Sequence, residues 1–209
     1  MSTELETIWV GGRRKLGKDP AFASWVKRAG PIRVPVHTEP PFYYLARAIV
    51  FQQLAGAAAR TIHGRFITAL GGDVSPAKVL RVREPTLRKA GLSAAKLAAI
   101  RDLATKVKSG EVEVHDLEAQ SDEEIIRRLT VVRGIGPWSA QMYLMFRLHR
   151  PDVWPVGDLG VRAGFATVHS MSKHPTPKAL EPLGDTYRPW RSAAAWYCWR
   201  AVDLAKKKG

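Results

Sequence analysis

Helix start and stop signals recur along this chain and enclose apolar residues at helical spacing. Ser93 precedes a run whose apolar positions share one helix face, and Gly110 follows it as a residue suited to a left-handed helix end. Ser121 and Glu124 have the spacing of a capping box, in which each side chain accepts a hydrogen bond from the other residue's backbone N–H. No long alternation of β-branched residues, the pattern typical of strands, accompanies these signals. The sequence therefore predicts an all-α fold.

Four further helices bear on function. Apolar spacing predicts helices over residues 41–54 and 57–70, with Gly56 as the break between them. A largely apolar helix is expected after Gly136, and a last helix is expected from residue 189 to about residue 205.

The charge balance favours an acidic partner. Lys and Arg number 33 against 19 Asp and Glu, so the formal net charge is +14. A strongly basic chain is typical of proteins that bind nucleic acid, although membrane-surface proteins share this property. No stretch reaches the roughly 18 apolar residues of a membrane span, and the N-terminus lacks the basic start of a signal peptide. We therefore expect a soluble cytoplasmic protein with no membrane partner.

Zinc sites and redox cofactors are not expected. Cys198 is the single cysteine, which excludes an intramolecular disulfide, a four-thiolate zinc site and a four-cysteine iron–sulfur cluster. The six histidines form no compact metal motif, so a catalytic zinc is not expected either.

A tight Gly-x-Gly turn lies between two expected helices. It contains Arg133, Gly134, Ile135 and Gly136, and Ser139 follows it. Glycines allow positive φ and close backbone approach, and the N–H groups at the start of the next helix attract an anion. The turn therefore suits a phosphate group. The alternative is that the glycines only turn the chain between two packed helices.

An aspartate stands at the start of another expected helix. Asp158 follows the segment Val153-Trp154-Pro155-Val156-Gly157. An Asp in this place is ordinarily a helix N-cap, and that is the alternative to a catalytic role.

Together these motifs resemble the helix-hairpin-helix DNA glycosylase superfamily, and within it 3-methyladenine DNA glycosylase II. The supporting segments, in chain order, are 49–54, 91–96, the hairpin at 129–140, the Asp158 loop and 189–192. The resemblance implies two helical lobes with a central cleft. One lobe would span 45–145 and contain the hairpin, and the other would join 1–44 to 146–209 and carry Asp158. The extra N-terminal β-rich domain of larger members is not expected in a chain of this length.

The resemblance also implies roles for single residues. Asp158 would be catalytic, and Gln53 would be the wedge that fills the gap left by a flipped nucleotide. Trp138, Trp199 and Met142 would line the base pocket, with Met142 standing where a well-known branch has Tyr, so that the pocket is less enclosed. The alternatives are core packing for the tryptophans and capping of neighbouring backbone by Gln52 and Gln53.

The hairpin residues Arg133, Gly134, Ile135, Gly136 and Ser139 would bind DNA phosphate. A structural Na⁺ or K⁺ on hairpin carbonyls is also implied, and no other cofactor is required.

The implied activity is base excision repair by a monofunctional DNA glycosylase, which flips and hydrolytically releases alkylated bases such as 3-methyladenine and 7-methylguanine and leaves an abasic site. Relatives that also cut the strand carry a Lys where this chain has Trp138, and that amine would form a Schiff base with the sugar. We expect a monomer acting on double-stranded DNA of the nucleoid. The alternatives are a glycosylase for an oxidised or mismatched base, a helix-hairpin-helix protein that only binds DNA and, more distantly, a basic RNA-binding protein.

Overall fold

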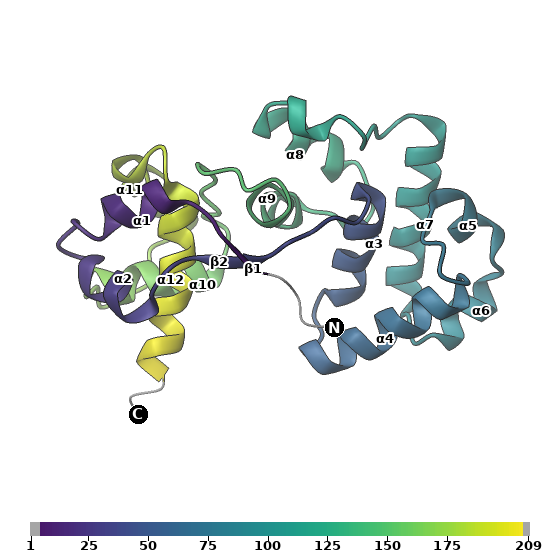
Figure 1. The fold of residues 1–209 in the computed structure, drawn as a ribbon, viewed down its shortest axis with the longest axis horizontal. Coiled ribbons are helices and arrows are strands. Elements are labelled where there is room, and N and C mark those ends of the chain that lie inside the picture. The colour runs from purple at the N-terminus through teal and green to yellow at the C-terminus, as the bar shows by residue number, and fades with distance from the viewer. Residues whose placement is uncertain (1–4, 207–209) are drawn as a thin grey trace. The chain divides into compact units, whose positions relative to one another are not determined.

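The computed structural model describes residues 5–206, and these are mainly helical (Figure 1). In chain order the α-helices are α1 (Val10–Leu16), α2 (Ala23–Ala29), α3 (Pro41–Phe51), α4 (Gly56–Ala69), α5 (Pro76–Arg81), α6 (Glu84–Lys89), α7 (Ala94–Ser109), α8 (Asp122–Thr130), α9 (Pro137–Phe146), α10 (Leu159–Val168), α11 (Pro177–Leu183) and α12 (Arg191–Lys206). Two short 3₁₀ helices are η1 (Leu117–Ala119) and η2 (Asp185–Tyr187). The predicted all-α class is confirmed.

A small antiparallel sheet is present that the sequence patterns did not predict. Strand β1 (Leu5–Thr7) pairs with β2 (Arg33–Pro35), with Glu6 opposite Val34. Three-residue strands are too short to produce a recognisable alternation. No helix among the described residues is long and apolar enough to cross a membrane.

The described residues fall into two compact units. The central unit is His37–Ala140, and the terminal unit joins the described residues before His37 to those from Gln141 onward. The boundaries expected from the sequence were residues 45 and 145, whereas the central unit begins at His37 and ends at Ala140.

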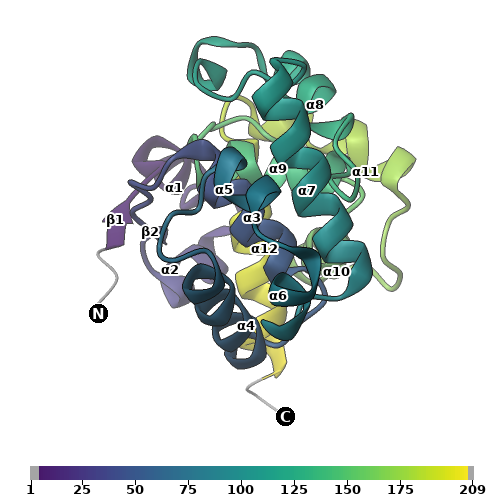
Figure 2. The ribbon, with the colours of Figure 1, turned by 90° about the vertical axis from the view of Figure 1, so that its right-hand side faces the viewer.

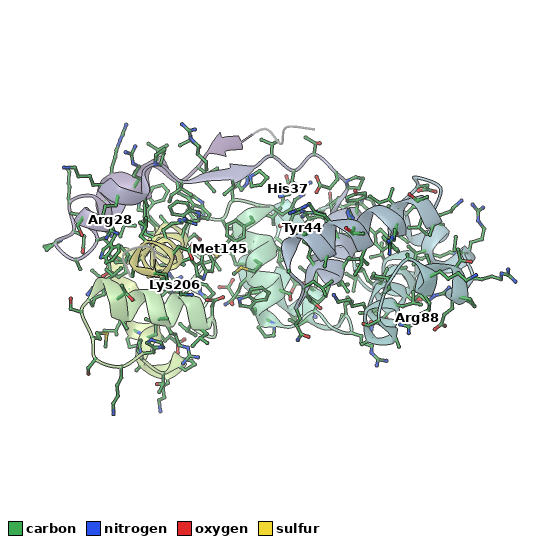
Figure 3. All side chains as sticks on the ribbon, turned by 90° about the horizontal axis from the view of Figure 1, so that it is seen from below. Arg28, His37, Tyr44, Arg88, Met145 and Lys206 are labelled. Atoms are coloured by element: carbon green, nitrogen blue, oxygen red, sulfur yellow. The ribbon has the colours of Figure 1, made fainter. Side chains whose placement is uncertain are left out.

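In the central unit α3 packs on α7 and α4 (Figures 1 and 2). The core contains Leu45, Ile49, Phe66, Leu97 and Ile100, which are almost fully buried. Helix α7 begins and ends as predicted. The Ser93 hydroxyl accepts a hydrogen bond from Lys96 N–H, and Gly110 takes the left-handed conformation at φ 79°. At the start of this unit the rings of His37 and Tyr44 meet edge to face, with centroids 4.8 Å apart (Figure 3).

In the terminal unit α12 is the central helix, and α1, α2 and α10 pack on it. Its Ala193, Ala194, Ala195, Tyr197 and Cys198 are fully buried. Small side chains on one helix let neighbouring helices approach closely. The last helix therefore forms as expected, although it begins at Arg191, two residues after the predicted start.

Two helix boundaries and one hydrogen bond of the capping box differ from the prediction. Helix α3 ends at Phe51, three residues before the predicted end, and Gly56 is the first residue of α4 and not a break. Half of the predicted capping box is present: the Ser121 hydroxyl accepts from Glu124 N–H at 3.2 Å. The Glu124 carboxylate accepts from two arginines of its own helix, Arg127 and Arg128.

Candidate active site

Asp158 caps the N-terminus of α10 in the terminal unit. Its Oδ1 accepts a hydrogen bond from the backbone N–H of Val161 at 2.7 Å. The same oxygen accepts a second one from the indole Nε1 of Trp199 at 2.9 Å. A carboxylate at this position also interacts favourably with the helix dipole. Asp158 is therefore a helix cap, as expected, and it is held by a side chain from another helix as well.

Two glycines of α10 allow the close packing that brings Trp199 to Asp158. Gly160 and Gly164 are four residues apart, so they lie on one face of the helix. A Cβ atom at position 160 would lie 2.8 Å from Cδ1 of Trp199, and one at position 164 would overlap the carbonyl of Cys198. Sequence reasoning missed both glycines, although their spacing in an apolar helix was a usable signal.

The loop before Asp158 is anchored in the terminal unit. Trp154 is buried, and its Nε1 donates to the carbonyl of Leu180 at 3.1 Å. Ser192, at the start of α12, accepts from Val153 N–H at 2.9 Å and donates to the carbonyl of Arg150 at 2.6 Å. These buried hydrogen bonds tie the loop to α12, the same helix that carries Trp199.

Charged groups reinforce this anchor. The Asp152 carboxylate accepts from Arg191 Nε at 2.8 Å and from Arg188 Nη1 at 2.6 Å. Arg191 is mostly buried whereas Arg188 is half-exposed, so we expect the first pair to contribute more to the anchor. Arg191 and Ser192 thus give the 189–192 segment a structural role, because both tie the loop before Asp158 to α12.

The hairpin lies in the central unit, between the end of α8 and the start of α9. Gly134 has φ 78°, and a Cβ atom there would lie 3.1 Å from Cβ of Ala99 on α7. Ile135 is buried beside it, whereas Gly136 is exposed and faces open space. The turn therefore needs glycine at 134 for the backbone conformation, while the protein itself leaves room for a side chain at 136.

The hairpin N–H groups are not equivalent. Arg133 N–H donates to Asp102 Oδ2 at 2.8 Å, and Ile135 N–H donates to a carbonyl within the turn. The N–H groups of Gly134 and Gly136 have no acceptor within residues 5–206. These two exposed donors are the ones available to an external anion.

Helix α7 supports the hairpin through a charged pair. Lys106 Nζ lies 2.9 Å from Asp102 Oδ2 and donates to the carbonyl of Val131 at 3.0 Å. Burial acts to raise the pKa of Asp102, but hydrogen bonds from Arg133 N–H and Lys106 outweigh it and hold the pKa below its usual value. The sequence analysis did not find these supporting residues, because they are 25 or more positions from the turn.

The predicted wedge residue lies in a loop and not on a helix. Gln53 follows the end of α3 and has φ 55°, a left-handed conformation that is uncommon for a residue with a side chain. The adjacent Leu54 is also exposed, at 36%. Helix α3 therefore ends before the predicted wedge residue, and Gln53 and Leu54 lie exposed in the tight turn that follows it.

Gln52 and Lys96 connect this loop to the hairpin within the central unit. Gln52 Nε2 donates to the carbonyl of Gly134 at 2.9 Å and to the Ser139 hydroxyl at 3.3 Å. Lys96 Nζ donates to the carbonyls of Val50 and Gln52 at 2.7 and 2.8 Å, and burial lowers the pKa of this amine. The capping alternative therefore describes Gln52, while Gln53 has no such bond among the described residues.

Trp138 is the second residue of α9 and is 48% exposed, so it is not a core residue. Met142 is four residues further along the same helix, which places both on one helix face. Asp158 and Trp199 meet in the terminal unit, and the wedge loop meets the hairpin in the central unit.

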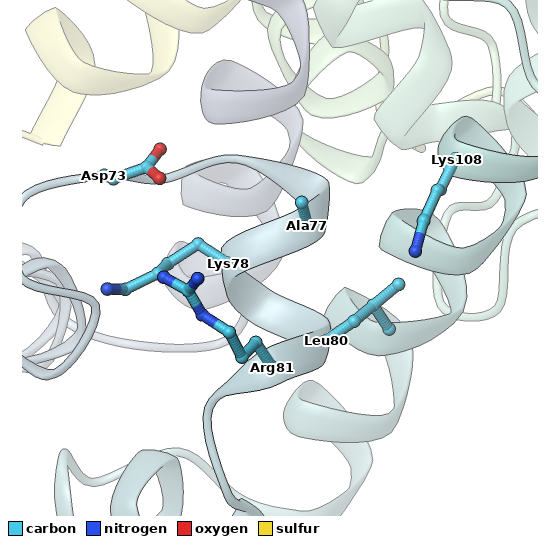
Figure 4. A pocket seen from close by; sticks show the side chains of 6 residues that line it. All are labelled: Asp73, Ala77, Lys78, Leu80, Arg81 and Lys108. Carbon is cyan, nitrogen blue, oxygen red and sulfur yellow. The ribbon is translucent and has the colours of Figure 1, made fainter.

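A separate hollow of about 460 Å³ lies in the central unit (Figure 4). It is lined by Asp73, Ala77, Lys78, Leu80, Arg81 and Lys108. None of the predicted site residues lines it, so it is not part of the candidate site.

The family is decided by comparison with known proteins. Residues 46–188 match the family described as HhH-GPD superfamily base excision DNA repair protein. The chain belongs to this superfamily. The hairpin and Asp158 lie within the matched residues of this HhH-GPD protein, whereas Trp199 lies beyond them. The resemblance found in the sequence is confirmed, and the protein acts on DNA.

Individual relatives of this HhH-GPD protein support the same assignment to the superfamily. It is 34% identical over 194 residues to DNA-3-methyladenine glycosylase 1 of Schizosaccharomyces pombe, covering 90% of this chain and 85% of that one. Its structure is similar to that of the S. pombe 3-methyladenine DNA glycosylase in complex with abasic DNA, with a TM-score of 0.81, 33% identity and coverage of 94% and 98%. It is also similar to a DNA-3-methyladenine glycosidase of Bacillus halodurans, with a TM-score of 0.84, 31% identity and coverage of 98% and 95%.

Proposed function

We propose that this HhH-GPD protein is a monofunctional DNA glycosylase that releases alkylated bases such as 3-methyladenine and 7-methylguanine and leaves an abasic site. The observation that carries the proposal is the Asp158 carboxylate, held by two N–H donors at the start of α10. The names of the similar S. pombe and B. halodurans proteins support the choice of lesion.

The chemistry follows from the leaving group. Alkylation of a purine ring nitrogen makes the base cationic, so it departs without being protonated by the protein. Positive charge then develops on the sugar, and the fixed carboxylate of Asp158 stabilises this oxocarbenium-like state and orients the attacking water. Trp138 stands where a strand-cutting relative would carry an amine, so no covalent intermediate with the sugar is expected.

The base pocket is proposed from the aromatic residues. A cationic base placed over an indole ring gains roughly 0.5 to 2 kcal/mol from the ring quadrupole. The half-exposed ring of Trp138 supports this role. Met142 supplies a flexible apolar side chain one turn along α9, and a ring face of Trp199 would complete the pocket.

The proposal is tested by incubating purified protein with methylated genomic DNA and identifying the released bases by mass spectrometry. Release of 3-methyladenine or 7-methylguanine is the expected result. Release of oxidised or mismatched bases alone would support the other glycosylase class, and DNA binding without any release would support a binding module. Size-exclusion chromatography of the same sample should show a monomer.

Phosphate binding is proposed for the exposed N–H groups of Gly134 and Gly136. Gly136→Val should weaken binding to duplex DNA of any sequence about tenfold, because its side chain blocks the close approach of a phosphate, whereas a Cβ atom at this position has no atom of the protein within 4 Å. Titration at several salt concentrations measures this. Because backbone N–H groups carry no net charge, the log–log salt slope should change by less than the roughly 0.9 expected for loss of one Lys or Arg contact to phosphate.

The matched control for this prediction is Gly64→Val, which also places a side chain in open space, on the exposed face of α4. It should bind DNA as the wild type does. Unchanged binding by Gly136→Val, with the protein folded, would show that the hairpin does not approach the phosphates.

Base flipping is proposed for the loop that contains Gln53 and Leu54. An enzyme that acts on a base in a duplex must extrude it, at a cost of a few kcal/mol, and side chains that fill the gap hold the flipped state. Gln53→Ala should lower base release from duplexes more than from substrates with an unpaired lesion. Single-turnover release from the two substrates gives the ratio, and Leu54→Ala tests its neighbour in the same way. Equal losses on both substrates would leave Gln53 with a structural role only.

A Na⁺ or K⁺ ion on the hairpin is also part of the proposal. Carbonyl oxygens are suitable ligands for such hard cations, and the turn provides several. Those of Val131 and Gly134 already accept hydrogen bonds from Lys106 and Gln52, and that of Val132 accepts from Ile135 N–H. The other hairpin carbonyls would therefore hold the ion, whose charge would add to the attraction for phosphate.

A further inference from the structure

Trp199 makes a specific polar contact in addition to its packing. Its indole Nε1 donates to Oδ1 of Asp158 at 2.9 Å, across 41 positions of sequence. Indole nitrogen is a donor only, so the direction of this hydrogen bond is fixed. Together with the backbone N–H of Val161, it places two donors on one carboxylate oxygen.

The position of the indole is set by the residues around it. Gly160 lies next to the five-membered ring of the indole: a Cβ atom there would be 2.8 Å from Cδ1 and 3.0 Å from Nε1 of Trp199. The ring of Phe146 lies on another side, with a centroid distance of 5.9 Å. Because the Cys198 backbone is packed on Gly164, the part of α12 that carries Trp199 cannot shift away easily.

We propose that Trp199 is a positioning residue for Asp158, acting through its indole N–H in addition to any contact of its ring with a base. This inference rests on the proposed function of Asp158. A carboxylate on a single-bonded side chain can rotate, and rotation moves its charge relative to the sugar. Two donors on Oδ1 remove that freedom before the reaction begins, so the protein need not reorganise when charge develops.

The test separates the N–H from the aromatic ring. Trp199→Phe keeps an aromatic face but removes the donor. Single-turnover release of 7-methylguanine should fall about 10- to 100-fold, the scale expected for loss of a hydrogen bond to a charged group. The affinity for duplex DNA containing an abasic site should stay within twofold. If release also stays within twofold of wild type, the positioning role is wrong.

The matched control is Trp196→Phe, which makes the same change three residues earlier in α12. Trp196 packs on Tyr197 and Arg200, its neighbours on the same helix. Base release by this variant should stay within twofold of wild type. A loss as large as that of Trp199→Phe would show a general effect of altering α12 and would overturn the inference.

A double variant distinguishes positioning from stacking. If Trp199 acts through Asp158, then adding Trp199→Phe to Asp158→Ala should cause no further loss of release. A ring that only stacks on the base acts independently of the carboxylate, and a further loss of tenfold would overturn the inference.

A measurement without DNA keeps this test independent of the proposed function. The indole N–H proton of Trp199, assigned by its absence in Trp199→Phe, should resonate downfield and exchange slowly with solvent. In Asp158→Ala it should move upfield and exchange at least tenfold faster. An unchanged resonance would overturn the inference even in an active enzyme. If wild-type protein releases no base while the resonance shifts as expected, the contact is upheld and the proposed function fails.

Discussion

Asp158→Asn should reduce single-turnover release of 3-methyladenine and 7-methylguanine by about 10² or more, the scale seen when one preorganised electrostatic group is removed. Asn has nearly the size of Asp and keeps an oxygen that accepts from Val161 N–H and Trp199 Nε1. The helix cap therefore survives, and only the negative charge is lost. Folding and binding to abasic DNA should remain close to wild type, because neither depends on charge stabilisation at the sugar.

The matched control for this charge change is Asp203→Asn. Asp203 is a half-exposed carboxylate of α12 that pairs with Arg200, so its substitution removes one charge from the same unit without touching the α10 cap. Release by this variant should stay within twofold of wild type. If Asp158 were only a helix cap, Asp158→Asn would also turn over within a few fold of wild type, and that result would remove the main support for an enzyme.

Gly164→Ala should destabilise the protein by roughly 3 kcal/mol, at the upper end of the usual cost of overpacking. The added Cβ would overlap the carbonyl of Cys198, which is backbone and cannot rotate away as a side chain would. Helices α10 and α12 would have to separate, and with them Asp158 and Trp199. Thermal unfolding should show a midpoint lower by about 6–12 °C for a chain of this size.

The control for this prediction is Gly64→Ala in α4. A Cβ atom there meets nothing within 4 Å, and alanine in an exposed helix is favoured over glycine by roughly 0.5–1 kcal/mol. This variant should be as stable as wild type or slightly more stable. A Gly164→Ala protein with an unchanged midpoint would contradict the helix packing described for α10 and α12.

Local signals were sufficient where an element depends on its own residues. Ser93 and Gly110 set the two ends of α7, and both were readable from the sequence, because capping acts within a few positions. The cap at Asp158 was readable for the same reason. The end of α3 was not, because Leu54 continues the helical apolar spacing from Val50, while Gln53 takes a left-handed conformation. Beside it, the Lys96 amine donates to the carbonyls of Val50 and Gln52 at the C-terminal end of α3, contacts that span 46 and 44 positions of sequence.

By itself the sequence determined the all-α class, the hairpin, the aspartate at the start of α10 and the superfamily. Only the tertiary structure decided that Trp199 donates to Asp158 and that Gln52 joins the wedge loop to Gly134. It also decided that the backbone of α12 packs directly on Gly164. The physical reason is the range of the interactions. Helix periodicity and capping act over a few neighbouring residues and leave a mark in local sequence. Hydrogen bonds and close packing between helices depend on which faces meet, and that is set only when the whole core of each unit is assembled.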